Sequence, residues 1–241
     1  MRVLALVVLA LLVVGCGGGG LVGVPATTFP FAAGTTWTAR HTQTPSGGST
    51  QTGTFTVIYR GTLTYRGATY HAADGASTLT PGLTERTHFA WNPVARTAAT
   101  VLTDASGTLE IIFSDPFITI GGNESRSGTT QVFFNGAFQG TGNYSVSTAS
   151  AGTFSVTVPA GTFTTTRWNW NLLIGLLGTN ASSYAVGNAS EVRRDATTSQ
   201  SGTTTGTYFL ELITGPVATG ASASEALSRA GVGTLPHSAA T

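Results

Sequence analysis

The segment Val132-Phe133-Phe134-Asn135-Gly136-Ala137-Phe138 predicts a tight β-hairpin. Asn and Gly both tolerate positive φ, which the two-residue turn between twisted strands requires, and apolar residues flank the pair on both sides. The two strands of such a hairpin must run antiparallel, because a parallel neighbour needs a crossover of a dozen residues or more. If the whole sheet is antiparallel, the rest of the chain should consist of strands joined by equally short connections.

Alternation of apolar and polar residues extends this pattern along the chain. In residues 54–59, Phe55, Val57 and Tyr59 share one side of the expected strand, and threonines occupy the other. Threonine suits outward positions, because a β-branched side chain fits a half-exposed sheet. Further strands are expected at residues 62–65, 68–71, 97–102, 108–113, 153–158, 163–170 and 207–213, with turns at Arg66-Gly67, residues 103–107 and Pro159-Ala160-Gly161.

These segments predict an all-β fold with a single antiparallel sheet of about ten strands. Every connection between them has hairpin length, and no amphipathic helix of ordinary length interrupts the series. We assign residues 28–215 to this β domain. Residues 216–241 are mostly small and are expected to form a tail, with a short helix possible near its middle.

The amino terminus has the composition of a secretory signal. Met1-Arg2 gives a positive start, and residues 3–14 are an unbroken apolar run. As a helix this run rises only about 18 Å, against roughly 30 Å for the hydrocarbon core of a bilayer. We therefore predict that residues 1–15 are a cleaved signal peptide, and a retained spanning anchor is the weaker alternative.

Val13-Val14-Gly15-Cys16 resembles the lipobox of bacterial lipoproteins, in which a small residue precedes the lipidated cysteine. Cys16 is the chain's one cysteine, so it has no partner for an internal disulfide. The resemblance implies a diacylglyceryl thioether on Cys16, usually with a further acyl chain such as palmitate. Residues 16–27 would then be a tether, made flexible by Gly17–Gly20. The alternative is an ordinary signal peptide with an incidental thiol.

A lipid-anchored product of this kind belongs to the cell envelope. Gly17 takes the place of the Asp that commonly retains lipoproteins in the inner membrane, so an outer-membrane location is expected in a host with two membranes. In a host with one membrane, the anchor lies on the outer face of the plasma membrane. The expected partner is thus a membrane, reached through the lipid.

Three segments resemble the TapB-like bacterial lipoproteins, a family of unknown function. The first is residues 28–38, with Phe29-Pro30 followed by Gly34 and Trp37, and the second is the turn at residues 156–163. The third, residues 184–189, lacks the proline and second glycine of the family's loop. The resemblance implies a strongly curved antiparallel sheet or an open β-barrel, like that of the lipoprotein carriers LolA and LolB. It assigns no catalytic residue.

Charge and motif content disfavour most enzymatic and nucleic-acid functions. Charged residues make up 9% of the chain and the net charge is +1, so the pair Arg193-Arg194 is not a nucleic-acid footprint. Nucleophile-elbow, zinc-protease, phosphate-loop and cysteine-pair motifs are missing from the sequence. We expect no catalytic residue, no metal site and no cofactor.

Several polar residues are candidates for acid–base or metal chemistry. His71 and Asp74 are close enough in sequence for an acid–base pair, although a strand-end histidine before an Asp-Gly turn is the favoured interpretation. The histidines are His41, His71, His88 and His237, and the charged residues expected to gather in the middle strands are Glu85, Arg86, Glu110, Asp115, Glu124 and Arg126. Ion pairs that set strand register and solubility are the favoured interpretation of the second group.

The most apolar stretch after the signal runs from Leu172 to Leu177. It contains Leu172, Leu173, Ile174, Leu176 and Leu177, interrupted by Gly175. One interpretation is a core strand or short plug. The other is the lining of an apolar cavity or rim that takes a lipid-like ligand or touches a bilayer.

Composition and motifs leave functional hypotheses from different classes. The favoured one is a lipid-anchored, non-catalytic binding module for an apolar ligand or an envelope partner. The second is a purely structural or surface-display lipoprotein. An enzymatic function is disfavoured, because no nucleophile–base pair and no cluster of metal-binding residues can be identified in the sequence.

Overall fold

The computed structural model describes residues 29–91, 95–118, 123–186 and 190–217. The expected signal peptide at residues 1–15, Cys16 and the tether to residue 27 lie outside these residues, as do residues 218–241 of the tail. Among the described residues, no helix has the length and hydropathy needed to span a membrane.

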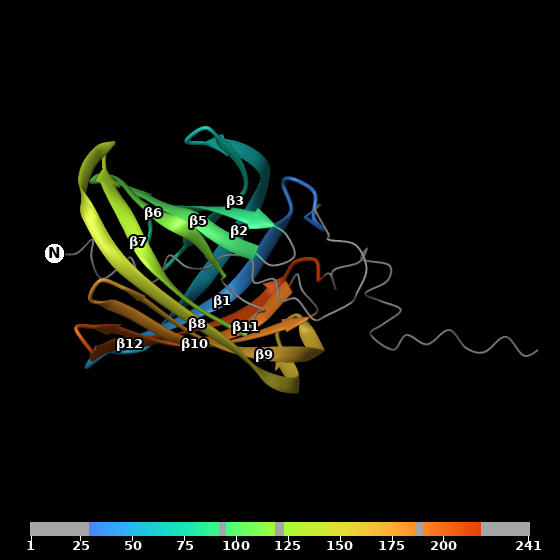
Figure 1. Ribbon diagram of the computed structural model, residues 1–241. Helices are drawn as coiled ribbons and strands as arrows, with labels where there is room; N and C mark the ends of the chain where they lie inside the picture. The colour runs from blue at the N-terminus through green and yellow to red at the C-terminus, as the bar shows by residue number, and fades with distance from the viewer. Residues whose placement is uncertain (1–28, 92–94, 119–122, 187–189, 218–241) are drawn as a thin grey trace, which may run out of the picture.

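The described residues form an antiparallel barrel in which each strand pairs with its neighbours in sequence (Figure 1). The strands are β1 (Thr36–Pro45), β2 (Gln51–Tyr65), β3 (Ala68–Ser77), β4 (Thr84–Trp91), β5 (Ala95–Asp104), β6 (Gly107–Ile118), β7 (Glu124–Phe134), β8 (Ala137–Val158), β9 (Gly161–Ile174), β10 (Leu177–Val186), β11 (Ser190–Gln200) and β12 (Thr203–Thr214). The all-β antiparallel prediction is confirmed. The sheet is also closed, because β1 pairs with β12 from Thr38 to Pro45.

Short turns join most of the strands, as the hairpin pattern predicts. Asn135 and Gly136 have φ values of 49° and 77° between the paired residues Phe134 and Ala137, so the hairpin predicted at Asn135-Gly136 is confirmed. Arg66-Gly67 is a second turn of this kind, with φ values of 48° and 83°.

Two turn predictions are wrong in detail. The expected loop at residues 103–107 is only Ala105-Ser106, because the Asp104 carboxylate accepts the Ser106 backbone N–H at 2.7 Å and lets Asp104 pair with Gly107. Asp74-Gly75, expected as a turn, lies inside β3 and pairs with Ile58 and Val57 of β2. The preference of Asp and Gly for turns is outweighed here by the backbone pairing of β3 with β2 on one side and with β4 on the other.

The barrel has two ends, which differ in what lies there. The described chain begins and finishes at one, which we call the terminal end, and the β8–β9 turn also lies there since the Ala160 N–H donates to the Leu212 carbonyl of β12. The opposite, distal end carries the β7–β8, β9–β10 and β11–β12 turns (Figure 1, left side).

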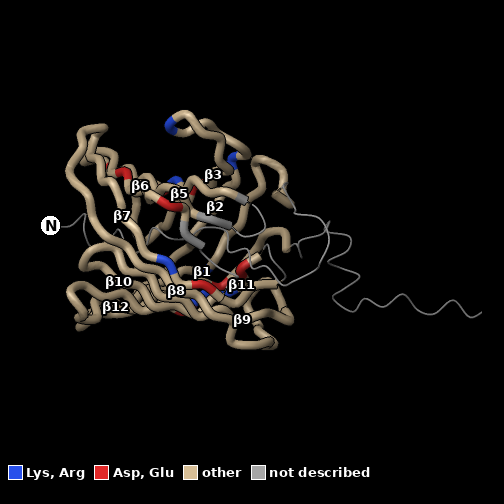
Figure 2. The backbone as a smooth tube through the Cα atoms, viewed as in Figure 1, with Lys and Arg blue, Asp and Glu red and all other residues tan. Residues whose placement is uncertain are grey.

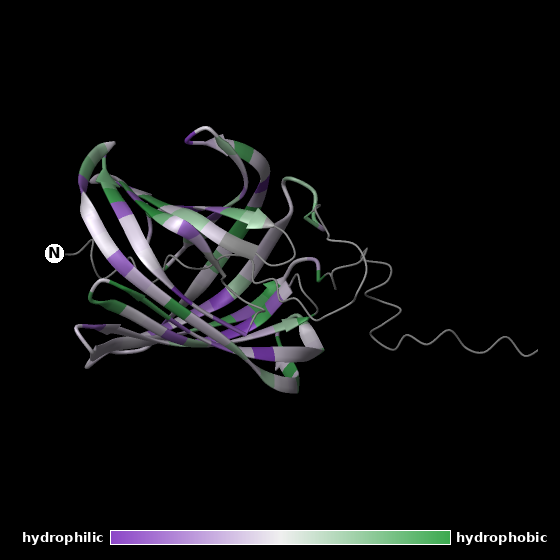
Figure 3. Ribbon diagram, viewed as in Figure 1, coloured by the Kyte–Doolittle hydropathy of each residue, from purple (hydrophilic) through white to green (hydrophobic). Residues whose placement is uncertain are grey.

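Alternate residues of the strands point inward and form two hydrophobic clusters. Figure 3 shows that hydrophobic positions are spread along the strands of the barrel. The cluster toward the distal end is built around Phe55, Trp170, Leu172 and Tyr208. The cluster toward the terminal end includes Phe29, which packs on Phe89 and Tyr59. Burial of each large apolar side chain stabilises the fold by about 1.5–3 kcal/mol. The closed barrel provides an interior in which the aromatic side chains of both clusters can be buried.

Candidate functional site

The apolar stretch 172–177 is a β-hairpin whose two strand ends contribute to the core and whose turn is exposed. Leu177 pairs with Ile174, which leaves Gly175 and Leu176 as a two-residue turn, and Gly175 has a φ of 57°. Leu172 is buried, and Ile174 and Leu177 pack against the same cluster. Leu173 is 42% exposed and Leu176 66% exposed. The stretch is continuous in sequence because two adjacent strand ends, each contributing to the core, meet at an apolar turn.

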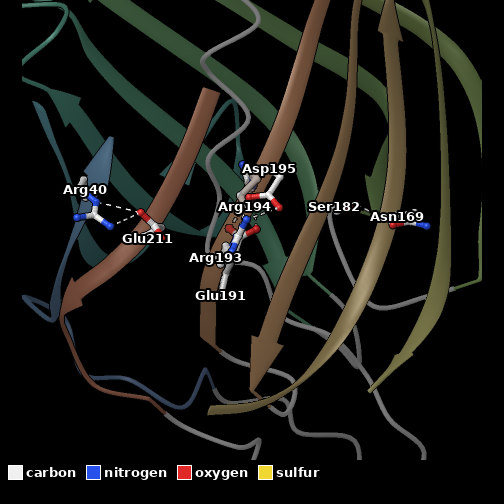
Figure 4. A network of polar contacts seen from close by, with 8 residues as sticks. All are labelled: Arg40, Asn169, Ser182, Glu191, Arg193, Arg194, Asp195 and Glu211. Atoms are coloured by element: carbon white, nitrogen blue, oxygen red, sulfur yellow. Dashed lines mark hydrogen bonds and ion pairs between the residues drawn. The ribbon is translucent and has the colours of Figure 1, made fainter. Parts of the chain in front are cut away.

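Arg193 and Arg194 do not form one positive patch. Successive residues of a strand point to opposite faces, so Arg193 lies outside, where Asp195 binds it at 2.8 Å, and Arg194 lies inside. The Arg194 guanidinium donates to both carboxylate oxygens of Glu191, at 2.8 and 2.5 Å, and stands 5.3 Å from the Trp170 ring centre. Figure 4 shows this inner pair beside the outer Arg193–Asp195 pair.

A β-bulge makes the inner ion pair possible. Tyr184 pairs with Arg193 while Ala185 pairs with Glu191, so Val192 is an extra residue in β11. In a regular strand Glu191 and Arg194 would point to opposite faces, and the bulge brings their side chains together. A bulge cannot be located from the alternation of apolar and polar residues, so this ion pair could not be predicted from the sequence.

Glu85, on β4, has a buried carboxyl group. It accepts the Thr87 hydroxyl at 3.2 Å. Burial raises the pKa of Glu85 well above its ordinary value, although the Thr87 hydrogen bond and the Arg194 charge act in the opposite direction. Burial lowers the pKa of Arg194, but the nearby Glu191 carboxylate outweighs that effect and the net shift is upward, so Arg194 stays charged. The Arg194 guanidinium and the Glu85 carboxyl group are thus both buried inside the barrel, with the partly buried Glu191 paired to Arg194.

The other charged residues expected to gather in one place lie in separate places (Figure 2). Arg86 and Arg60 bind the two carboxylate oxygens of Asp74 on the outer surface. The remaining contacts are Tyr65 and Arg66 on Glu110, Arg126 on Glu124, and the Tyr144 hydroxyl on the backbone carbonyl of Asp115. Some of these contacts lie within one strand and others join strands that are not neighbours in the sheet. No two carboxylates face each other among these described residues.

The described histidines each have a separate environment. His71 bonds the Tyr59 hydroxyl at 2.6 Å and stacks on Phe89, whereas Asp74 is held by two arginines, so the acid–base pair does not form. His41 bonds Ser77 and His88 stacks on Tyr65. His237 lies outside the described residues. Within the part of the chain that the structure describes, no three His, Cys, Asp or Glu side chains lie together as metal ligands do.

The outer face of β9 and β10 carries a polar feature that the sequence analysis missed. Asn171 donates to Asn180 at 2.5 Å, and Ser182 donates to Asn169 at 2.9 Å, across the pair of strands (Figure 4 labels the second contact). We call Asn169, Asn171, Asn180 and Ser182 the asparagine ladder. The spacing Asn169-x-Asn171 within an expected strand could have predicted it, because residues two apart lie on the same face of a strand.

Comparisons with known proteins give structural neighbours and no family. No family model and no curated protein matches the sequence. A crystal structure of a candidate lipoprotein from Parabacteroides distasonis is similar at 16% identity and a TM-score of 0.40, over 76% of this chain and 97% of that one. A candidate exported protein with a YmcC-like fold from Bacteroides fragilis is similar at 11% identity and a TM-score of 0.39, over 77% and 96%.

Proposed function

We propose that this chain is a lipid-anchored protein of the bacterial cell envelope whose barrel is a non-catalytic binding module. The lipobox-like segment ending at Cys16 supports the anchor. The β9–β10 hairpin is the proposed contact for an apolar ligand or envelope partner. The observation that carries this site is the exposure of Leu173 and Leu176, 42% and 66%, beside core residues of the same hairpin.

The position of the hairpin favours a contact on the side away from the anchor. The described chain begins at the terminal end, and the β9–β10 turn lies at the distal end. Residues 16–28, which separate Cys16 from that start, span at most about 45 Å when fully extended. With the terminal end toward the anchoring bilayer, the β9–β10 turn lies at the opposite end of the barrel, where it can meet a soluble apolar ligand or a partner in the envelope.

The test compares exposed and buried leucines of one hairpin in the full-length chain. Leu173→Ser/Leu176→Ser should keep the melting temperature and weaken binding of a fluorescent fatty acid, because both side chains lie outside the core. The matched variant Leu172→Ser should instead lose several kcal/mol of stability, since it leaves a cavity and a buried hydroxyl. A second measurement places a photo-cross-linking residue at position 176 in cells, with and without Leu173→Ser. Unchanged fatty-acid binding by the exposed double variant, together with the same cross-linked partners in both chains, would exclude the hairpin as the site.

The structural or surface-display hypothesis is the second candidate. It is favoured by the outer faces of β2 and β12, where exposed threonines such as Thr52 and Thr205 make a polar body with few large apolar groups. It predicts that the exposed double variant behaves like the parent in every binding and cross-linking measurement.

A further inference from the structure

Three asparagines in the middle of β9 and β10 are unexpected on an outer sheet face. Asn169, Asn171 and Asn180 all point outward, and they pair in register, Asn171 with Asn180 and Asn169 with Ser182. Asparagine is depleted in strands, and threonine fills comparable outward positions elsewhere in this barrel. Strand formation therefore does not explain these amides.

The asparagine ladder is the centre of a groove that crosses five strands on the outer surface. One register row is Ser147, Asn171, Asn180, Thr197 and Thr207, and the next is Ala149, Asn169, Ser182, Asp195 and Phe209. These residues line a depression of about 590 Å³. Four strand spacings give it a length of about 19 Å, which suits an extended chain lying across the strands.

A ridge of arginine and aromatic side chains borders the groove. Arg193 lies over Tyr184, Tyr184 contacts Phe154 edge-on, and Arg167 lies over Phe154 at 4.7 Å. Arg193 is neutralised by Asp195. Arg167, which lines the groove, has no carboxylate partner among the described residues, and its buried Nε has no hydrogen-bond partner there. The groove thus contains one positive charge that the described part of the protein leaves uncompensated.

We propose that this groove binds an acidic oligosaccharide. Each amide of the ladder has two N–H donors and a carbonyl, and the contacts within the ladder use only part of them. Planar amides at fixed spacing match the paired donors and acceptors of neighbouring sugar hydroxyls, and Phe209, 37% exposed, gives an apolar surface for the C–H face of a ring. Arg167 pairs with the carboxylate, for which a guanidinium is the suited partner.

This site is separate from the exposed leucines of the β9–β10 hairpin and does not depend on the function proposed for them. Apolar binding and saccharide binding can fail independently, because the variants that test them share no residue.

The test titrates the full-length chain with hexagalacturonate and with maltohexaose, an uncharged hexamer. We expect the acidic hexamer to bind more tightly. Asn171→Thr/Asn180→Thr should weaken it by about tenfold or more, through loss of several hydrogen bonds, with a melting temperature equal to or above that of the parent. Arg167→Gln should remove the preference for the acidic sugar. Gln131→Thr, on the exposed face of β7, is the matched control and should change neither.

Three results would overturn the proposal. Equal affinity of the asparagine double variant and the parent would show that the amides do not contact the sugar. Absence of binding by hexagalacturonate and by uronate hexamers of other linkages and sugar types would exclude an acidic oligosaccharide as the ligand class. Equal binding of the acidic and uncharged hexamers by the parent chain would exclude the carboxylate contact with Arg167.

Discussion

Buried histidines are the individual residues that link the stability of this barrel to pH. His41 is fully buried with its Nδ1 on the Ser77 hydroxyl, and its Nε2 has no partner among the described residues. Burial lowers the pKa of His41 to about 4. Burial also lowers the pKa of His88 to about 4, with a smaller contribution from Arg86, against the opposing charges of Asp74 and Glu110. Both rings are neutral in the folded protein at pH 6.

We therefore predict that the contribution of these two histidines to stability falls as pH decreases from about 6.5 to about 4. In that window the unfolded chain binds protons at both histidines, since their pKa is near 6.5 there, and the folded chain does not. The limiting slope is about 1.4 kcal/mol per pH unit for each histidine. Urea unfolding across this range measures it. His41→Gln and His88→Gln should each flatten the profile, and a profile that neither variant changes would contradict the burial of these rings.

Lipidation of Cys16 is a second prediction at the scale of one residue. Metabolic labelling with an alkyne fatty acid should mark the parent chain, because the cysteine follows a lipobox-like segment. Cys16→Ser removes the only sulfur that can form the thioether, so it should carry no label and leave the membrane fraction. Equal labelling of the two chains would exclude this anchor.

Secondary-structure elements in this protein follow the sequence closely where the alternation is regular. The pairing of Phe134 with Ala137 and the side shared by Phe55, Val57 and Tyr59 were both predictable, because turn chemistry and strand period depend on neighbouring residues alone. Bulges are different. The bulge at Val192 depends on how β11 pairs with β10 and β12. The sequence around Val192 therefore does not indicate the Arg194–Glu191 pair.

The turn at Asn135-Gly136 supplies the prediction for a single hairpin. Gly136 has a φ of 77°, and a β-branched residue is strained there even though a Cβ added at this position would meet nothing within 4 Å. Gly136→Val should therefore destabilise the barrel by on the order of 1–3 kcal/mol. Gly136→Asn is the control, since asparagine tolerates this conformation and should cost much less. Thermal or urea unfolding measures the difference in stability between each variant and the parent. Equal stability of Gly136→Val and the parent would mean that the turn is misplaced.

At the scale of the whole molecule, closure of the sheet lay beyond sequence reasoning. Among the described strands, eleven of the pairings join neighbours in sequence, and these are predictable from short connections. The twelfth joins β1 to β12 across most of the chain, and nothing in either strand alone distinguishes a sheet edge from a seam. Closure also decides the interior, because Leu172, expected either in a core strand or in the lining of an apolar cavity, packs with Trp170 in the core of a barrel.

The seam between β1 and β12 gives the last prediction. A Cβ added at Gly206 would lie 2.8 Å from the Thr44 backbone oxygen and 3.2 Å from the Pro45 Cα, so only glycine lets the two strands approach to this distance. Gly206→Ala should push the seam apart locally and destabilise the barrel by about 1–3 kcal/mol. Hydrogen exchange of the seam amides should quicken more than that of the β7–β8 amides. Thr204→Ala, at an exposed position of the same strand, is the control and should leave exchange unchanged. If Gly206→Ala leaves both stability and seam exchange unaltered, β1 and β12 do not close the sheet in this register, and the residues placed inside the barrel would face a sheet with two open edges.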